Sequence, residues 1–326
     1  MIFFWIGFIA LVCLMLALDL GVFNKNDHEI GTREALRWTG VWVTVSLLFN
    51  VFVYFAYEHH WLGIGHVNGW PQSDGWDAAL NFFTGYLVEK SLSLDNIFVM
   101  ALIFKSFAIP RLLQHRVLFW GILGALVMRG VMIGAGAALV MRFSWVMYIF
   151  GAFLVYTALK MHFAGDEHEE AIDPDKHRLV VLARKLFPVS PGLDGHKFFT
   201  RIDGRLAITP LLLVLLIIES TDLLFAVDSI PAIFAITTDP FLVFTSNILA
   251  ILGLRSLYFA LAAMMAQFRH LKTSIIFVLG FVGVKMLVVD FLHVPSWLSL
   301  LIILSALAVG VLASHLLPEA EADKNN

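Results

Sequence analysis

The sequence predicts an all-α integral membrane protein, and three observations support this fold class. Of its 326 residues, 60% are hydrophobic and only 14% are charged, whereas about 25% of the residues in a soluble domain are charged. The mean hydropathy is +0.84. The apolar residues form about nine runs, each about long enough to cross a ~30 Å hydrocarbon core as a helix. We expect these helices at 2–22, 36–57, 78–105, 115–141, 145–163, 208–236, 242–266, 272–290 and 296–316.

The placement of basic residues predicts how the chain is oriented. Lys and Arg gather in every second connection, most of all between 160 and 205, whereas the alternate connections hold only Arg142. The positive-inside rule then places the N-terminus outside and the C-terminus in the cytoplasm. We expect 2–22 to be a membrane span and not a signal peptide, because no basic residue precedes it and no small-residue cleavage motif follows it. The single cysteine, Cys13, rules out an intrachain disulfide.

Two parts of the chain read as an internal repeat. The motif EKSLSLDNI, starting at Glu89, matches DLLFAVDSI, starting at Asp222: an acid is followed six residues later by Asp, a small polar residue and Ile. The bases downstream occur in the same order, Arg129 and Lys160 in the first copy and Arg255 and Lys285 in the second. The predicted divisions are 1–57 with two helices, 78–163 as the first three-helix repeat, 164–207 as a cytoplasmic loop with one short amphipathic helix, 208–290 as the second repeat, and 296–326 as the last helix and tail.

The predicted topology makes the two repeats inverted relative to each other. The helix at 78–105 would run inward and the helix at 208–236 outward. Inverted repeats with a binding site near the midplane recur in secondary transporters. The pattern therefore favours a transporter.

Acidic residues inside the two motif-bearing helices are the strongest functional signal. A carboxylate near the bilayer centre costs a few kcal/mol at least, so such residues usually face a polar interior and carry function. Carboxylates that converge in low dielectric need a cation or protons to neutralise them. Oxygen ligands suit Mg²⁺, Ca²⁺ or Mn²⁺, and the absence of Cys and His from both segments disfavours zinc or copper. The predicted ligands are Glu89, Asp95, Asn96, Glu219, Asp222 and Asp228.

The six-residue spacing predicts a break in the helix. In a straight helix Asp228 lies on a different face from Asp222, so a break is expected if both are to face one site. Pro231 would supply it, because proline clashes with the carbonyl four residues earlier and frees it.

A buried charge network is the structural alternative to a cation site. Four intramembrane bases, with charge-balancing or gating roles, accompany the acids: Lys90, Arg129, Arg255 and Lys285. Both interpretations can hold, because Arg129 and Arg255 could pair with the acids in the empty state and be displaced during transport. The acidic and histidine-rich loop 166–177 is interpreted as solvated surface, with collection or sensing of a divalent cation as the alternative. The outer loop 58–77 is interpreted as plain surface, with a cation exit vestibule as the alternative.

The motif segments resemble the TerC family of bacterial membrane proteins. EKSLSLDNIFV and ESTDLLFAVDSIPAIFAITTDPFLVFTSNILAILGLRSLYF look like its signature segments, and LDLGVFNK and HRVLFWGILGALVMRG resemble its Alx branch. The resemblance implies export of Mn²⁺ and a relation to LysE-type transporters built from duplicated three-helix units. The family's acidic motif residues correspond to Glu89, Asp95, Glu219, Asp222 and Asp228.

Taken with this resemblance, the sequence predicts a Mn²⁺ exporter of a bacterial inner (plasma) membrane that works by alternating access, with protons as counter-ion. The expected partners are Mn²⁺ as substrate, protons and the lipid bilayer, with no nucleic acid and no tightly bound organic cofactor. The alternatives are an exporter of another hard cation, a proton or Na⁺ antiporter, and a non-transporting factor that helps to metallate other proteins. An enzyme is not expected, because no G-x-G-D segment of an intramembrane aspartyl protease surrounds Asp95 or Asp228.

Overall fold

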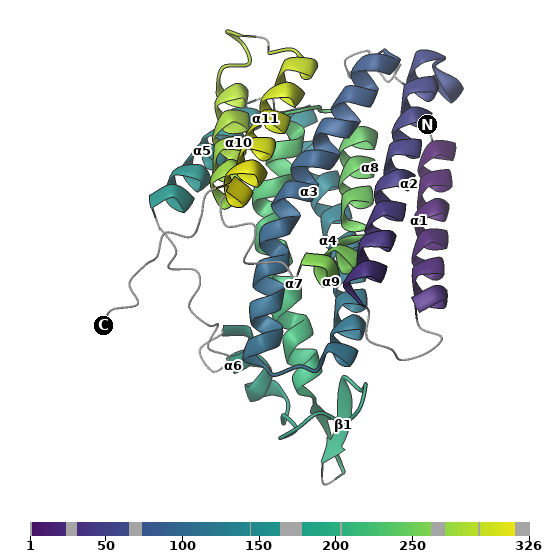
Figure 1. Cartoon of the computed structure of the whole chain (residues 1–326), viewed down its shortest axis with the longest axis vertical. Helices are drawn as coiled ribbons and strands as arrows, with labels where there is room; N and C mark the ends of the chain where they lie inside the picture. The colour runs from purple at the N-terminus through teal and green to yellow at the C-terminus, as the bar shows by residue number, and fades with distance from the viewer. Residues whose placement is uncertain are drawn as a thin grey trace.

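The computed structural model describes residues 2–23, 31–64, 74–143, 145–163, 178–202, 204–261, 271–292 and 294–316 (Figure 1). These residues form an almost entirely helical fold, as predicted. Eight of the nine predicted ranges coincide with single helices: α1 (Ile2–Phe23), α2 (Thr32–Glu58), α3 (Gly75–Ser106), α4 (Arg111–Arg142), α5 (Val146–Phe163), α7 (Pro210–Phe234), α10 (Leu271–Leu287) and α11 (Ser296–Leu316). A short 3-10 helix, η1 (Trp61–Gly63), follows α2.

The long helices α3 and α7 occupy the middle of the molecule and position the site (Figure 1). Helix α3 packs against α2 and α7, and α4 packs against α7. On one side, α5 and α10 pack closely because Gly151 and Gly283 face each other. A Cβ on Gly151 would lie 2.9 Å from the carbonyl oxygen of Gly283. On the other side, Phe8 of α1 and Phe49 of α2 belong to one aromatic cluster.

The seventh predicted helix, 242–266, is wrong as a single element. The structure has two helices there, α8 (Pro240–Ile251) and α9 (Leu254–Leu261), with a bend of 42° between them. Gly253 lies in the bend with φ +103°, a conformation that favours glycine. A Cβ at Gly253 would lie 2.8 Å from the Cβ of Trp42 in α2, so the absence of a side chain also lets α2 approach.

The connection between α5 and α7 contains the predicted amphipathic helix and a hairpin that was not predicted. The helix is α6 (Arg178–Leu186), and the hairpin pairs β1 (Phe199–Ile202) with β2 (Arg205–Ile208) in antiparallel register. The sequence does contain a signal for the hairpin: an Asp-Gly pair at 203–204 between two short runs is a preferred two-residue turn. Gly204 has φ +76°, as such a turn requires.

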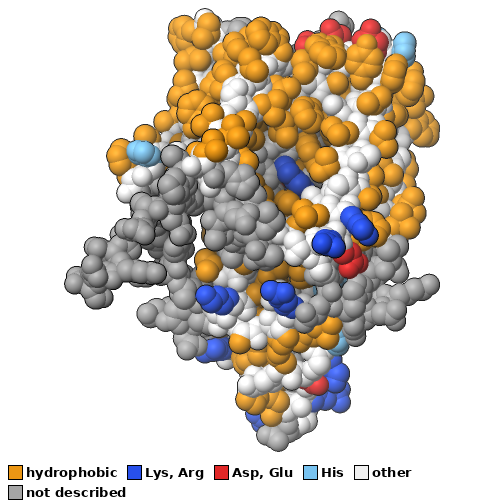
Figure 2. Space-filling view, viewed as in Figure 1, with side chains coloured by type: hydrophobic (Ala, Val, Ile, Leu, Met, Phe, Trp, Pro, Cys, Tyr) orange, Lys and Arg blue, Asp and Glu red, His pale blue; other side chains and the backbone are white. Residues whose placement is uncertain are grey.

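Five helices in the described residues are long and apolar enough to cross a membrane, or six if the bent pair α8–α9 is one span. The five are α2, α4, α5, α7 and α11. Figure 2 shows hydrophobic side chains over the upper part of this face and most Lys and Arg side chains over its lower half. The structure thus supports an integral membrane protein, while the nine-span topology and the inverted repeat stay predictions.

Candidate functional site

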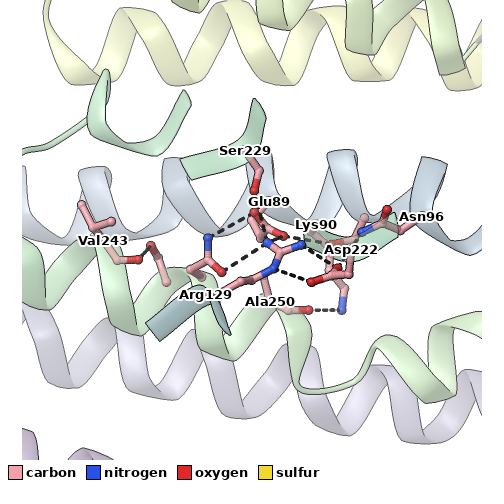
Figure 3. A network of polar contacts seen from close by, with 11 residues as sticks. Glu89, Lys90, Asn96, Arg129, Asp222, Ser229, Val243 and Ala250 are labelled. Atoms are coloured by element: carbon pink, nitrogen blue, oxygen red, sulfur yellow. Dashed lines mark hydrogen bonds and ion pairs between the residues drawn. The ribbon is translucent and has the colours of Figure 1, made fainter. Parts of the chain in front are cut away.

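Three buried charged residues meet where α3, α4 and α7 pass one another (Figure 3). Glu89 of α3 is 0% exposed, Arg129 of α4 is 1% exposed and Asp222 of α7 is 4% exposed. Asp222 lies 12 residues from each end of α7, and Glu89 lies 14 residues from the start of α3 and 17 from its end. The cluster therefore occupies the middle of its helices, away from both ends.

The guanidinium of Arg129 holds the two acids together. Its Nη1 forms an ion pair with Glu89 Oε1. Its Nη2 donates to Asp222 Oδ1 at 2.9 Å and its Nε donates to Asp222 Oδ2 at 3.2 Å, a bidentate contact. Nη1 also donates to Ser229 Oγ at 3.2 Å and to Asn247 Oδ1 at 3.4 Å. Such fork-shaped contacts fix geometry as well as charge.

Each central carboxylate also accepts a bond from a buried amide. Asn96 of α3 donates through Nδ2 to Asp222 Oδ1 at 3.0 Å, and Asn247 of α8 donates through Nδ2 to Glu89 Oε2 at 3.2 Å. Asn96 was among the predicted ligands, whereas Asn247 was missed. The available signal was an Asn that follows Thr245 and Ser246 in the largely apolar segment FLVFTSNILAI.

Two buried oxygen atoms near the centre have no hydrogen-bond partner within the described part of the chain. They are Asn96 Oδ1 and Glu219 Oε2. Buried polar atoms are nearly always bonded in native proteins, so an orphan acceptor points to a cation, a proton or a water molecule.

Glu219, partly buried on α7, rests on the bare backbone of α4. A Cβ on Gly124 would overlap the carboxylate of Glu219. The donors of Arg129 contact other residues, and Asp222 is the charge that acts on Glu219, with the same sign. Glu219 thus adjoins the centre without being neutralised by its arginine.

The structure places Asp95 and Asp228 apart from the central cluster. Asp228 accepts a hydrogen bond from Thr157 Oγ1 of α5 at 3.1 Å, and Lys160 of α5 acts on it electrostatically. Lys272 of α10 acts on Asp95 in the same way. Both acids are thus under the electrostatic influence of bases on the α5–α10 pair.

The predicted helix break at Pro231 is wrong. Helix α7 is continuous from Pro210 to Phe234 and contains Pro231 in its last turn. The lost hydrogen bond is therefore tolerated close to the helix end. A continuous helix turns about 100° per residue, so Asp222 and Asp228 point to different sides.

The other predicted bases differ in their surroundings. Lys90 donates through Nζ to the carbonyl of Ala250 at 3.0 Å (Figure 3). Lys285 is partly buried on α10. Arg255, 2% exposed on α9, lines with Asp222 a small cavity of about 10 Å³. That volume matches about one water molecule, and its other lining residues are Met100, Leu118, Gly121, Ile122, Ala125, Ile218 and Leu254.

No three His, Cys, Asp or Glu side chains of the described residues converge on one point as metal ligands. The centre instead holds two acids and one guanidinium. Two further bases adjoin this trio, because Lys90 lies next to Glu89 and Arg255 lines a cavity with Asp222.

Comparison with known proteins identifies a family whose match includes the three helices of this site. Residues 74–322 match the integral membrane protein TerC family. The chain belongs to the TerC family. Membrane protein STKORF319 of Myxococcus xanthus is 47% identical over 98% of this chain and 95% of its own. Alx of Escherichia coli (strain K12), whose name proposes a membrane-bound redox modulator, is 44% identical over 94% of this chain and 92% of its own.

A third relative of this TerC family member is also similar over nearly its whole length. Alx of Photorhabdus laumondii is 42% identical over 98% of this chain and 97% of its own. No solved structure matches the chain.

Proposed function

We propose that this TerC family member exports a divalent hard cation, Mn²⁺, from the cytoplasm by alternating access. The observation that carries the proposal is the pair Glu89 and Asp222, held by Arg129 in the middle of three helices. Two buried carboxylates from separate helices form a site that a mobile cation can share with a guanidinium. The resemblance to TerC proteins contributes the identity of the metal.

In this proposal Arg129 stands in for the transported ion. When the cation enters, it takes the carboxylate oxygens that the guanidinium now contacts. Neutral oxygens adjoin them, from Asn96, Ser229 and Asn247. Hard cations such as Mn²⁺ prefer this kind of oxygen-rich site.

The outlying acids fit a path through the centre. Under the nine-span topology with two inverted repeats, α3 runs inward and α7 outward. Asp95 then lies on the cytoplasmic side of Glu89, and Asp228 lies on the outer side of Asp222. Each would then provide an additional binding position for the ion, one on either side of the central pair.

Export requires a driving force. An inside-negative potential opposes cation exit by about 2.3 kcal/mol per charge per 100 mV, so about 4.6 kcal/mol for a divalent ion. Protons that move inward onto the same carboxylates would supply it. The basic lower end of the molecule (Figure 2) supports placing that end in the cytoplasm.

The name of the Alx relatives suggests a redox role as a competing function. A dithiol couple within one chain would need two cysteines, and this chain has one. We therefore rank cation export above redox chemistry carried by the protein itself.

Flux measurements test the proposal. Proteoliposomes with the parent chain are expected to transport Mn²⁺, and Glu89→Gln and Asp222→Asn should each lose most of this flux. Asp77→Asn, an exposed acid at the outer start of α3, is the matched control and should keep it. Competition by Mg²⁺, Ca²⁺, Zn²⁺ and Fe²⁺ reports selectivity, and a pH gradient reports proton coupling.

Three outcomes of these measurements would contradict the proposal or part of it. If Glu89→Gln and Asp222→Asn both transport Mn²⁺ at the parental rate, these carboxylates do not form the transport site. Mn²⁺ binding without flux in the parent would favour a metallation factor. Equal rates of Mn²⁺ flux with and without a pH gradient would contradict the proposed coupling to protons.

A further inference from the structure

The break between α8 and α9 leaves a backbone carbonyl without its helical partner. The α8 ladder ends where the N–H of Leu252 donates to the carbonyl of Ile248 at 3.0 Å. Close to that end, the carbonyl of Ala250 accepts the ammonium of Lys90, which reaches across from α3 at 3.0 Å. Figure 3 shows this contact beside the acid cluster.

Packing holds the break in place. Gly253 adopts φ +103°, and Trp42 of α2 lies against its backbone where a side chain would otherwise stand. The 12-residue helix α8 therefore ends at a fixed point inside the protein. The carbonyl end of a helix carries about half a negative charge, which favours a cation there.

A freed carbonyl at membrane depth must find a donor or a cation. In transporters with broken helices, unwound carbonyls and helix C-termini coordinate small cations such as Na⁺. Here the partner is an ammonium, a compact single charge on a flexible stem. The carboxylate of the adjacent Glu89 adds negative potential at Lys90.

We propose that the α8–α9 break is a monovalent-cation site that the chain fills with its own Lys90 ammonium. Without Lys90, this site would bind an alkali-metal ion or a small alkylammonium ion. In the parent chain the Lys90 ammonium occupies the position and excludes both. The filled site holds the start of α9, which carries Arg255 beside Asp222. The parent chain is therefore independent of external monovalent cations at this position.

Chemical rescue of stability tests the site. Purified full-length Lys90→Ala in detergent is expected to unfold several degrees below the parent in choline chloride. Replacing choline by Na⁺, K⁺ or methylammonium at constant ionic strength should restore half or more of the shift, saturably, and the three ions compared separately identify the preferred occupant. The parent should be indifferent to these ions. The matched control is Lys105→Ala, an exposed lysine in the last turn of α3, which should show no cation response.

Two results would overturn the inference. One is unfolding of Lys90→Ala at the parental temperature in choline, which would show that the carbonyl needs no cation. The other is a lowered unfolding temperature that none of the three ions raises, which would make the ammonium merely structural. If Lys90→Ala does not fold, Lys90→Met replaces it, because its side chain fills similar space without a donor for the Ala250 carbonyl, and the same ions must stabilise it. The readout is unfolding, so it decides this proposal whether or not Mn²⁺ export holds.

Discussion

Removal of Arg129 tests whether the central charges form one network. The residues Glu89, Arg129 and Asp222 are 0%, 1% and 4% exposed, and the guanidinium contacts both carboxylates. In Arg129→Gln, both carboxylates stay buried without their cation. Removing one partner of a buried ion pair destabilises by about 3–5 kcal/mol, so the free energy of unfolding should fall by about that amount.

A variant without charges provides the control. Replacing all three residues by neutral, similarly shaped ones, in Glu89→Gln with Arg129→Gln and Asp222→Asn, leaves no uncompensated charge. Its free energy of unfolding should lie within about 1–2 kcal/mol of the parent, because neutral replacement of a buried ion network is often nearly neutral. Reversible unfolding in mixed micelles, followed by the fluorescence of the nine tryptophans, measures both variants. A triple variant that loses the sum of the three single losses would refute the network, because independent sites add.

The same variant tests whether Arg129 competes with the transported ion. Without the guanidinium, Mn²⁺ should stabilise Arg129→Gln more than it stabilises the parent. Binding to the folded state alone adds about 2.7 kcal/mol when the ligand is at 100 times its Kd. An equal Mn²⁺ response in both proteins would show that Arg129 does not occupy the ion's place.

Two glycine contacts yield further predictions. Gly124→Ala should displace the Glu219 carboxylate and lower the free energy of unfolding by about 1–3 kcal/mol; Glu219→Ala in the same chain should restore most of it, and additive losses would contradict the contact. Gly151→Ala should separate α5 from α10, because its Cβ would lie 2.9 Å from the Gly283 oxygen, with a similar loss. Gly134→Ala is the control, because a Cβ there meets no atom within 4 Å; its stability should be unchanged or higher by about 0.5–1 kcal/mol. Equal losses at Gly151 and Gly134 would refute the close packing.

The sequence was sufficient for the helices and for much of the centre. Long apolar runs can only become helices in a bilayer, so their positions follow from composition. Glu89 and Asp222 were recognisable because a carboxylate in such a run has a cost that function must explain. Arg129 followed as the buried base in the neighbouring helix.

The break at Gly253 and the role of Asn247 depend on contacts between distant residues. A glycine inside an apolar run reads as helix, and only its packing against Trp42 of α2 shows why the chain turns there. Asn247 bonds Glu89, 158 residues away in the chain. Local patterns contain no information about either contact. The hairpin after α6 is different, because its Asp-Gly turn was visible in the sequence.

The six-residue spacing of the acids now has a geometric explanation. With α7 unbroken, the spacing gives it one acid at the centre and one facing the α5–α10 pair. Asp228 accepts a hydrogen bond from Thr157 of α5, whereas Asp95 of α3 is under the electrostatic influence of Lys272 of α10. Because α5 and α10 are packed closely at their glycines, a shift of this pair against α3 and α7 changes the surroundings of both outlying acids together. The central pair, held by Arg129 of α4, does not depend on that contact, so the spacing separates the centre from the acids that flank it.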